Sequence, residues 1–152
     1  MKDLDLAFNI EDFTKEVKGE LELAVERILY AWGLKGVEGC VEKATEINPE
    51  VGRDTVDTGR YRAGFGFITP QNARMSGTPV TPSEDNPVRP TDSLLSHRSE
   101  KNSVIIANNV EYAKFLEAGT VKMPARYIMK NGIESKFNDM KTQAEEILKG
   151  EL

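Results

Sequence analysis

Apolar side chains recur every three or four residues through the first third of the chain, a spacing that does not suit a strand. A helix places all of them on one face: Phe13, Val17, Leu21, Ala24, Ile28, Ala31 and Trp32. We predict a single helix over about residues 10–47, which Asn9 can cap and which ends before the proline that follows Asn48.

Three glycines interrupt the second half of this predicted helix at intervals of three residues. Gly33, Gly36 and Gly39 each cost about 1 kcal/mol relative to alanine in a helix interior. Together they make a smooth face that a second backbone could approach closely. A kink near Gly33 is the alternative that the sequence leaves open.

Two short strands and a long loop are predicted in the middle of the chain. Residues 64–68 place Phe65 and Phe67 on one face of a strand and glycines on the other, and residues 103–107 form a second strand rich in β-branched residues. Between them, residues 70–99 hold five of the seven prolines, which cannot donate to a sheet ladder. We therefore predict an extended assembly loop over 70–99 that does not extend the hairpin and is ordered by neighbouring subunits.

The last third of the chain is predicted to hold two helices. Asn109 can cap a short helix that runs through Leu116 and ends at Gly119 in a left-handed conformation. Residues 120–123 form a short extended piece, and Pro124 opens the final helix. We expect Phe137 in the core beneath the sheet, as part of the apolar stripe Met129, Ile133, Phe137, Met140, Ala144, Ile147 and Leu148.

These elements predict one α+β domain over residues 1–152, a length that suits a single core. It consists of a long N-terminal helix, a small antiparallel sheet with a long inserted loop, a short helix and a C-terminal helix. No apolar run approaches the roughly 18–20 residues of a membrane span, and the first residues are too acidic for a signal peptide. We therefore expect no membrane partner.

Cysteine and histidine are almost absent, which narrows the chemistry open to the chain. Cys40 is the one cysteine and His97 the one histidine, so an internal disulfide or a Cys- or His-based metal cluster cannot form within one chain. This composition disfavours zinc enzymes, Ser-His-Asp hydrolases and Cys-His proteases. We predict no enzymatic activity and no cofactor, with Cys40 and Trp32 buried in the core and His97 in a loop.

The net charge of −5 is unevenly distributed along the chain. Residues 1–50 carry 12 acidic and 6 basic side chains, residues 51–99 carry 5 and 6, and residues 100–152 carry 8 of each. Proteins that grip duplex DNA present a basic face to its phosphates, and the sequence has no basic block. The acidic balance suits a protein that lets DNA pass, and it suits many ordinary acidic proteins equally.

The tripeptide Asp57-Thr58-Gly59 is the most enzyme-like motif. Aspartic proteases use it in two copies whose carboxylates share one proton, and a homodimer could supply the second copy. Arg60 and Arg62 follow at once, however, and two guanidinium groups favour ionised carboxylates. We therefore interpret Asp57 as a turn cap and keep an aspartic-protease-like homodimer using Asp57 as a remote alternative.

Four charged positions admit more than one interpretation. Arg60 and Arg62 could contact phosphate groups, but we favour ion pairs with the carboxylates of a neighbouring subunit, for which the planar guanidinium is well suited; a plain solvated role is the equal alternative. Glu111 and Glu117 could form a catalytic carboxylate pair. Because the sequence offers them no partner acid or base, we interpret them as solvated or interface carboxylates.

Several short motifs follow the predicted first helix in a definite order. They are VDTGRYR at residues 56–62, IANNVEYA at 106–113, FLEAGT at 115–120 and MPAR at 123–126. This order resembles that of the small neck, or tail-completion, proteins of tailed double-stranded DNA bacteriophages, over about residues 10–148. The chain departs from the pattern at Tyr127, where the family often has proline and then phenylalanine, and in the length of the 70–99 loop.

The resemblance implies a structural virion protein, assembled in the host cytoplasm, at the head–tail interface. It implies a homo-oligomeric ring of about six or twelve copies, stacked on adjacent connector and tail ring proteins, with double-stranded DNA passing through the lumen without sequence-specific binding. A tail-terminator ring or a head-side stopper ring is the alternative within this class. The positions assigned to assembly or structure are Asp57, Thr58, Gly59, Arg60, Arg62, Glu111, Tyr112, Glu117, Gly119, Pro124 and Arg126.

Overall fold

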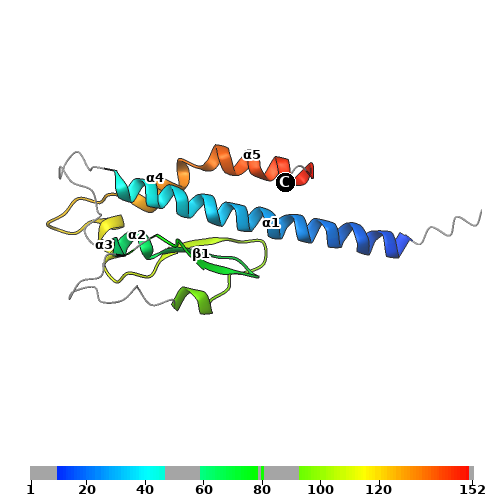
Figure 1. The fold of residues 1–152 in the computed structure, drawn as a ribbon, viewed down its shortest axis with the longest axis horizontal. Coiled ribbons are helices and arrows are strands. Elements are labelled where there is room, and N and C mark those ends of the chain that lie inside the picture. Colours follow the sequence, from blue (N-terminus) through cyan, green and yellow to red (C-terminus); the bar gives the residue numbers. More distant parts are fainter. Residues whose placement is uncertain (1–9, 47–58, 79, 81–92, 151–152) are drawn as a thin grey trace, which may run out of the picture.

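The computed structural model describes residues 10–46, 59–78, 80 and 93–150. One face of the long helix α1 packs on a small sheet, and another packs on the helices α4 and α5 (Figure 1). This arrangement confirms the predicted α+β class. The elements are, in chain order, α1 (Ile10–Thr45), α2 (Arg60–Ala63), β1 (Phe65–Ile68), β2 (Ala73–Met75), the 3-10 helix η1 (Ser93–Ser96), β3 (Ile105–Asn108), α3 (Ala113–Ala118), α4 (Ile128–Glu134) and α5 (Phe137–Leu148).

The helix α1 is continuous over 36 residues, as its apolar spacing predicts. It passes through Gly33 without interruption. The glycines allow other parts of the chain to pack closely against the helix. The ring of Phe67 fills the space that a Cβ at Gly33 would need, and at Gly39 the backbone of Gly132 in α4 lies in that space. The predicted close approach of a second backbone is therefore confirmed. The proposed cap, Asn9, lies outside the described residues.

The sheet is antiparallel with the strand order β2-β1-β3. Phe67 of the central strand β1 lies opposite Arg74 of β2 on one side and Ile106 of β3 on the other. All four residues of β1 are buried. The strand contacts α1 and also the short helix η1. Phe65 and Phe67, which the sequence places on one face, are 0% and 1% exposed.

The strand β2 shows that the prediction of an irregular loop over residues 70–99 is wrong in part. Residues 73–75 extend the hairpin from β1, because the turn before them closes locally. The backbone N–H of Thr69 donates to the carbonyl of Asn72 at 2.7 Å, and the Thr69 hydroxyl accepts from the N–H of Asn72 at 2.9 Å. The short helix η1 also packs on β1 and β2 within the chain itself. Residues 79 and 81–92 of this segment lie outside the described part.

The start of α3 differs from the prediction. The helix begins at Ala113 with Tyr112 in the cap position, so Asn109 is not its cap. The asparagine one residue earlier organises the turn instead: the side-chain oxygen of Asn108 accepts from the N–H of Val110 at 2.9 Å, and its nitrogen donates to the carbonyl of Tyr61 at 2.8 Å.

The predicted final helix is two helices. Pro124 does not open it, because α4 begins at Ile128, after Tyr127 in a left-handed conformation with φ 48°. A turn at Ser135 and Lys136 then separates α4 from α5. Residues 120–123 form a tight turn closed by a Thr120–Met123 bridge rather than an extended piece.

The turn between α4 and α5 shifts the phase of the apolar positions, and this decides which of them are buried. Met140 and Ile147 face the body of the protein and are 8% and 7% exposed, whereas Phe137 and Leu148 are 56% and 61% exposed. The expectation that Phe137 lies in the core is therefore wrong. Trp32 is half-buried rather than fully buried, and its indole N–H donates to the carbonyl of Met140 at 2.8 Å.

The core sits where α1 meets β1, α2 and α4. Cys40 belongs to it, as predicted, and is 0% exposed. Tyr61 links this core to the neighbouring rings, edge-on to Phe65 at 4.9 Å and stacked on Tyr112 at 6.2 Å between centroids. The buried members of the cluster are Val37, Cys40, Ala44, Tyr61, Phe65, Phe67, Ala113 and Ile128.

Candidate functional site

Motif residues from three distant parts of the sequence meet at the end of the molecule formed by α2, α3 and the start of α4 (Figure 1). Gly59 precedes α2 with φ 82°, a left-handed conformation that favours glycine. Its neighbours Asp57 and Thr58 lie outside the described residues, so the proposed turn cap remains a prediction.

Arg60 pairs with a carboxylate of its own chain. Its guanidinium donates to both carboxylate oxygens of Glu111, at 3.1 and 2.9 Å, across 51 positions of sequence. It also lies over the ring of Tyr112, at 5.8 Å from the centroid. The pKa of Glu111 is lowered, first by a hydrogen bond from its own backbone N–H and then by Arg60. Arg60 therefore has a carboxylate partner within its own chain, and an ion pair with a neighbouring subunit stays a prediction.

Arg62 and Arg126 share a different feature. The Nε atom of each is buried without a hydrogen-bond partner among the described residues. The backbone carbonyl of Arg62 accepts from the hydroxyl of Ser76 at 2.9 Å, which ties α2 to the end of the hairpin. The backbone N–H of Arg126 donates to the carbonyl of Leu116 at 2.9 Å, which brings the MPAR motif against α3.

Glu117 caps the start of α4 from a distance of 12 positions in the sequence. Its two carboxylate oxygens accept from the backbone N–H groups of Met129 at 2.8 Å and Lys130 at 3.0 Å. These are among the N–H groups that a helix cannot satisfy internally, and a negative charge is favourable at this end of the helix dipole. Glu111 and Glu117 therefore have separate partners, and Glu117 is a structural cap rather than a solvated carboxylate.

Gly119 allows the chain to double back between Glu117 and α4. Its φ of 76° and ψ of −179° lie in a region essentially limited to glycine, so the predicted positive φ is confirmed although the conformation is not that of a left-handed helix. A Cβ here would lie 2.6 Å from the backbone N of Ala125 and 2.8 Å from the carbonyl oxygen of Met123. Pro124 is exposed in this turn.

Replacing Glu117 with alanine should lower the free energy of unfolding by about 2 kcal/mol. The variant leaves two N–H groups at the start of α4 without their acceptor, and hydrogen bonds to charged groups contribute about 1.5–3 kcal/mol. Urea unfolding measures the change. Glu117→Gln retains one acceptor oxygen and should lose about half as much, whereas Glu111→Ala should have almost no effect because its side chain is 70% exposed. Equal losses for Glu117→Ala and Glu111→Ala would contradict the capping role.

The buried thiol and hydroxyl near this cluster are held in their protonated forms. Burial raises the pKa of the Cys40 thiol to about 12, and the charge of Glu117 adds to this rise. Burial, with a smaller contribution from Glu117, also raises the pKa of the Tyr61 hydroxyl, whose oxygen has no hydrogen-bond partner among the described residues. Neither group is a nucleophile at neutral pH, since nucleophilic attack by cysteine requires the thiolate.

The described part of the chain also lacks a cluster of metal-binding side chains. No group of three or more histidine, cysteine, aspartate or glutamate side chains there could hold a metal ion. His97 is exposed, and its Nδ1 lies 3.3 Å from the hydroxyl of Ser96. Within these residues, no helix has the length and apolar character needed to span a bilayer.

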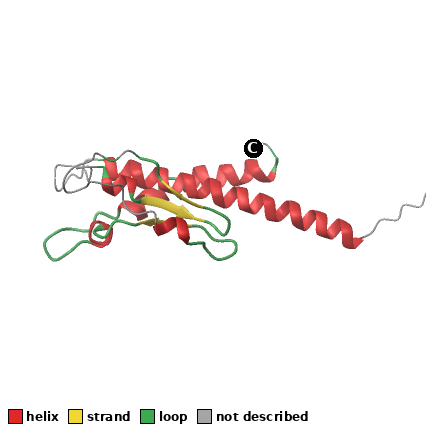
Figure 2. Cartoon of the chain, turned by 60° about the horizontal axis from the view of Figure 1, so that its bottom comes forward, coloured by secondary structure: helices red, strands yellow, loops and turns green. Residues whose placement is uncertain are grey.

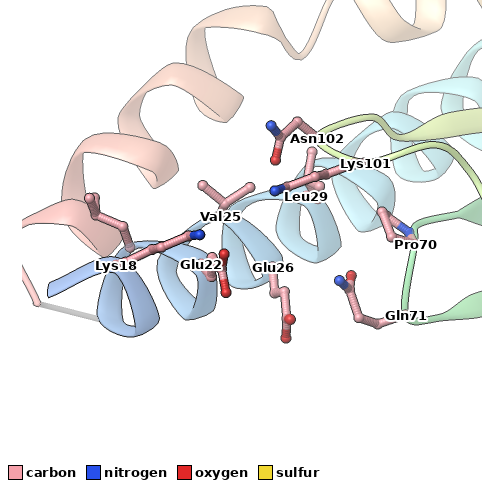
Figure 3. A pocket seen from close by; sticks show the side chains of 10 residues that line it. Lys18, Glu22, Val25, Glu26, Leu29, Pro70, Gln71, Lys101 and Asn102 are labelled. Carbon is pink, nitrogen blue, oxygen red and sulfur yellow. The ribbon is translucent and has the colours of Figure 1, made fainter. Parts of the chain in front are cut away.

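The larger of the hollows described beside α1 lie away from the motif cluster. The first, which we name the apolar groove, has a volume of about 550 Å³ and lies between α1, β3, α4 and α5. The second is a polar crevice of about 500 Å³ between α1 and the turns at the far end of the sheet. Figure 3 shows Lys18, Glu22 and Glu26 of α1 along this crevice, with Lys101 and Gln71 from the turns. The apolar groove is lined by Trp32, Val104, Ile106, Ile133, Phe137, Met140, Lys141, Ala144, Glu145 and Leu148.

Comparisons with known proteins found no match among protein-family models, curated proteins or solved structures.

The cluster contains two residues that the sequence did not single out as functional, Tyr61 and Asn108. Both lie within the quoted motifs, so the signal was present. The two residues are hydrogen-bonded to each other across 47 positions of sequence, and a local pattern does not pair residues so far apart.

Proposed function

We propose that this chain is a structural protein of the neck of a tailed double-stranded DNA bacteriophage, where copies form a ring that joins the DNA-filled head to the tail. The observation that carries the proposal is the convergence of the resembling motifs. Arg60, Glu111 and Tyr112 contact one another, and Glu117 and Arg126 connect the next two motifs to each other across α3 and α4. The described parts of these motifs thus form one structural unit, which supports the proposal.

The charge of the chain agrees with a passive role toward DNA. The net charge is −5, and the first 50 residues hold twice as many acidic as basic side chains. An acidic surface near the lumen would repel phosphate groups and let the genome slide, whereas strong binding would need a basic face. Arg60, a basic residue of the first motif, forms a salt bridge with Glu111 of the same chain.

Unpartnered apolar surface supports assembly with other protein subunits. Leu21 on α1 and Phe137 and Leu148 on α5 are each more than half exposed, and Phe137 and Leu148 line the same groove. Contiguous exposed apolar side chains mark interaction sites. Identical subunits that contact one another through two different surfaces close into a ring where the rotation permits it. The same features would serve a tail-terminator or a head-side stopper ring, which are the alternative positions in the neck.

Deletion of the gene from the virus that encodes it tests the proposal. We expect filled heads and complete tails that remain separate in electron micrographs, and we expect purified wild-type protein to join them in the lysate. The Asp57→Asn variant should join them equally well, because asparagine caps a turn as aspartate does, whereas a protease would lose its essential carboxylate. Normal yields of joined particles from the deletion would overturn the proposal.

A further inference from the structure

The N-terminal part of α1 carries apolar side chains that the described chain covers only in part. We name residues 14–28 the arm; Figure 2 shows the start of α1 extending beyond the sheet and α5. Val17 and Leu21 are 37% and 54% exposed and lie one helical turn apart on the predicted apolar stripe. Leu21 also lines the end of the polar crevice. Leu23, which is 60% exposed, lies on the opposite side of the helix, so the arm has one apolar edge.

The apolar groove is the matching concave surface. Phe137 and Leu148 at its rim are more than half exposed, and Trp32, on the same stripe of α1 as the arm residues, forms part of its wall. Small-ligand sites need a few convergent polar groups. In the groove the Trp32 N–H is already bonded to Met140, and the other polar side chains of the lining are Lys141 and Glu145, both on α5. An apolar edge of a helix needs no such groups.

We propose that the arm of one copy of this chain docks in the apolar groove of a second copy, antiparallel to α5. The arm cannot reach the groove of its own chain, because α1 is continuous and Trp32 of the same helix already lines it. Two arms packed together would leave both grooves in water. An arm in a groove buries both surfaces in a single contact, and this head-to-tail contact can propagate to a closed ring. The inference deepens the proposed function and rests on its homo-oligomeric part.

The charges beside the two surfaces favour the antiparallel direction. Lys18 and Glu22 lie one turn apart on the arm, and Lys141 and Glu145 lie one turn apart along the groove. An antiparallel arrangement brings Lys18 to Glu145 and Glu22 to Lys141, whereas a parallel one would bring like charges together. None of these four side chains forms a salt bridge within the described residues, so all four are available to a second copy.

Sedimentation equilibrium of the purified full chain at roughly 10–500 µM tests the docking. We expect the wild-type mass to rise with concentration above the 16.9 kDa of the chain. Leu21→Glu in the arm and Leu148→Glu in the groove should each weaken self-association by about 30-fold or more, because each places a charge in the buried interface. An equimolar mixture of the two variants should form a heterodimer and nothing larger, since one intact arm and one intact groove remain.

Matched controls separate this contact from a general loss of structure or of apolar surface. Leu23→Glu alters the other side of the arm, and Val121→Glu alters a fully exposed residue far from the groove; both should associate within about twofold of wild type. Unchanged helical circular dichroism verifies that each variant folds. The charge reversal Lys141→Glu with Glu145→Lys should weaken association several-fold, and adding Lys18→Glu with Glu22→Lys should restore it.

Three results would overturn the docking proposal. They are a wild-type chain that stays monomeric at the highest concentration, a Leu148→Glu variant that still dimerises as arm–arm pairing would predict, and a mixture of the two variants that fails to associate. These solution measurements are independent of head–tail joining. A chain that associates as described but leaves heads and tails separate would refute the neck function alone, and a chain that joins them without this contact would refute the docking alone.

Discussion

Truncation of Phe67 to alanine is expected to lower the free energy of unfolding by about 3–5 kcal/mol, the usual range for a buried phenylalanine. Its ring is 1% exposed, packs edge-on against Tyr30 at 5.2 Å between centroids, and fills the space above Gly33. Removal of the ring leaves a cavity at the contact between α1 and the sheet, where two rigid elements cannot easily close together. Urea or thermal unfolding monitored by circular dichroism measures the loss.

Phe137 is the matched control for this measurement. It has the same side chain, but it is 56% exposed at the start of α5, so Phe137→Ala should cost under about 1 kcal/mol. Phe137→Ala should instead weaken self-association, because the ring lines the apolar groove. If both truncations cost the same free energy of unfolding, the placement of α5 relative to α1 described here would be wrong.

Gly39→Ala should destabilise the fold by up to about 2 kcal/mol, although alanine is the better helix former. A Cβ at this position would collide with the carbonyl group of Gly132, whose carbon would be 2.8 Å away. The neighbour is backbone rather than the flexible end of a side chain, so α1 and α4 must separate to make room. Overpacking of this kind typically costs about 1–3 kcal/mol. The gain of about 1 kcal/mol in helix propensity offsets part of this cost, which leaves a net loss of up to about 2 kcal/mol.

Gly19→Ala, in the same helix, should change the free energy of unfolding in the opposite direction to Gly39→Ala. Nothing in the described chain lies within 4 Å of the position of its Cβ, so only the backbone effect remains. This variant should raise the free energy of unfolding by about 0.5–1 kcal/mol. A loss at Gly19 as large as that at Gly39 would indicate a general intolerance of α1 to alanine, and the close crossing with α4 would then not be the cause.

Local periodicity was sufficient to predict the elements whose pattern lies within a single stretch of chain. The apolar stripe predicted α1 almost to its last residue. Alternation predicted β1, and a run of β-branched residues predicted most of β3. The spacing of Gly33, Gly36 and Gly39 indicated that a backbone would approach this face. Periodicity could not identify the approaching backbone, because Gly132 is far along the chain and is selected by the folded topology.

Three features were decided only by tertiary structure. The turn at Ser135 and Lys136 re-phases the last apolar stripe and leaves Phe137 at the rim of a groove, because α4 and α5 must each follow the surface of α1. Glu117 is a cap only once α3 brings its carboxylate to the start of α4. Arg60 finds Glu111 across 51 positions of sequence. Side-chain type and spacing determine what a residue can do, whereas its partner depends on loop closure between distant elements, which no local pattern encodes.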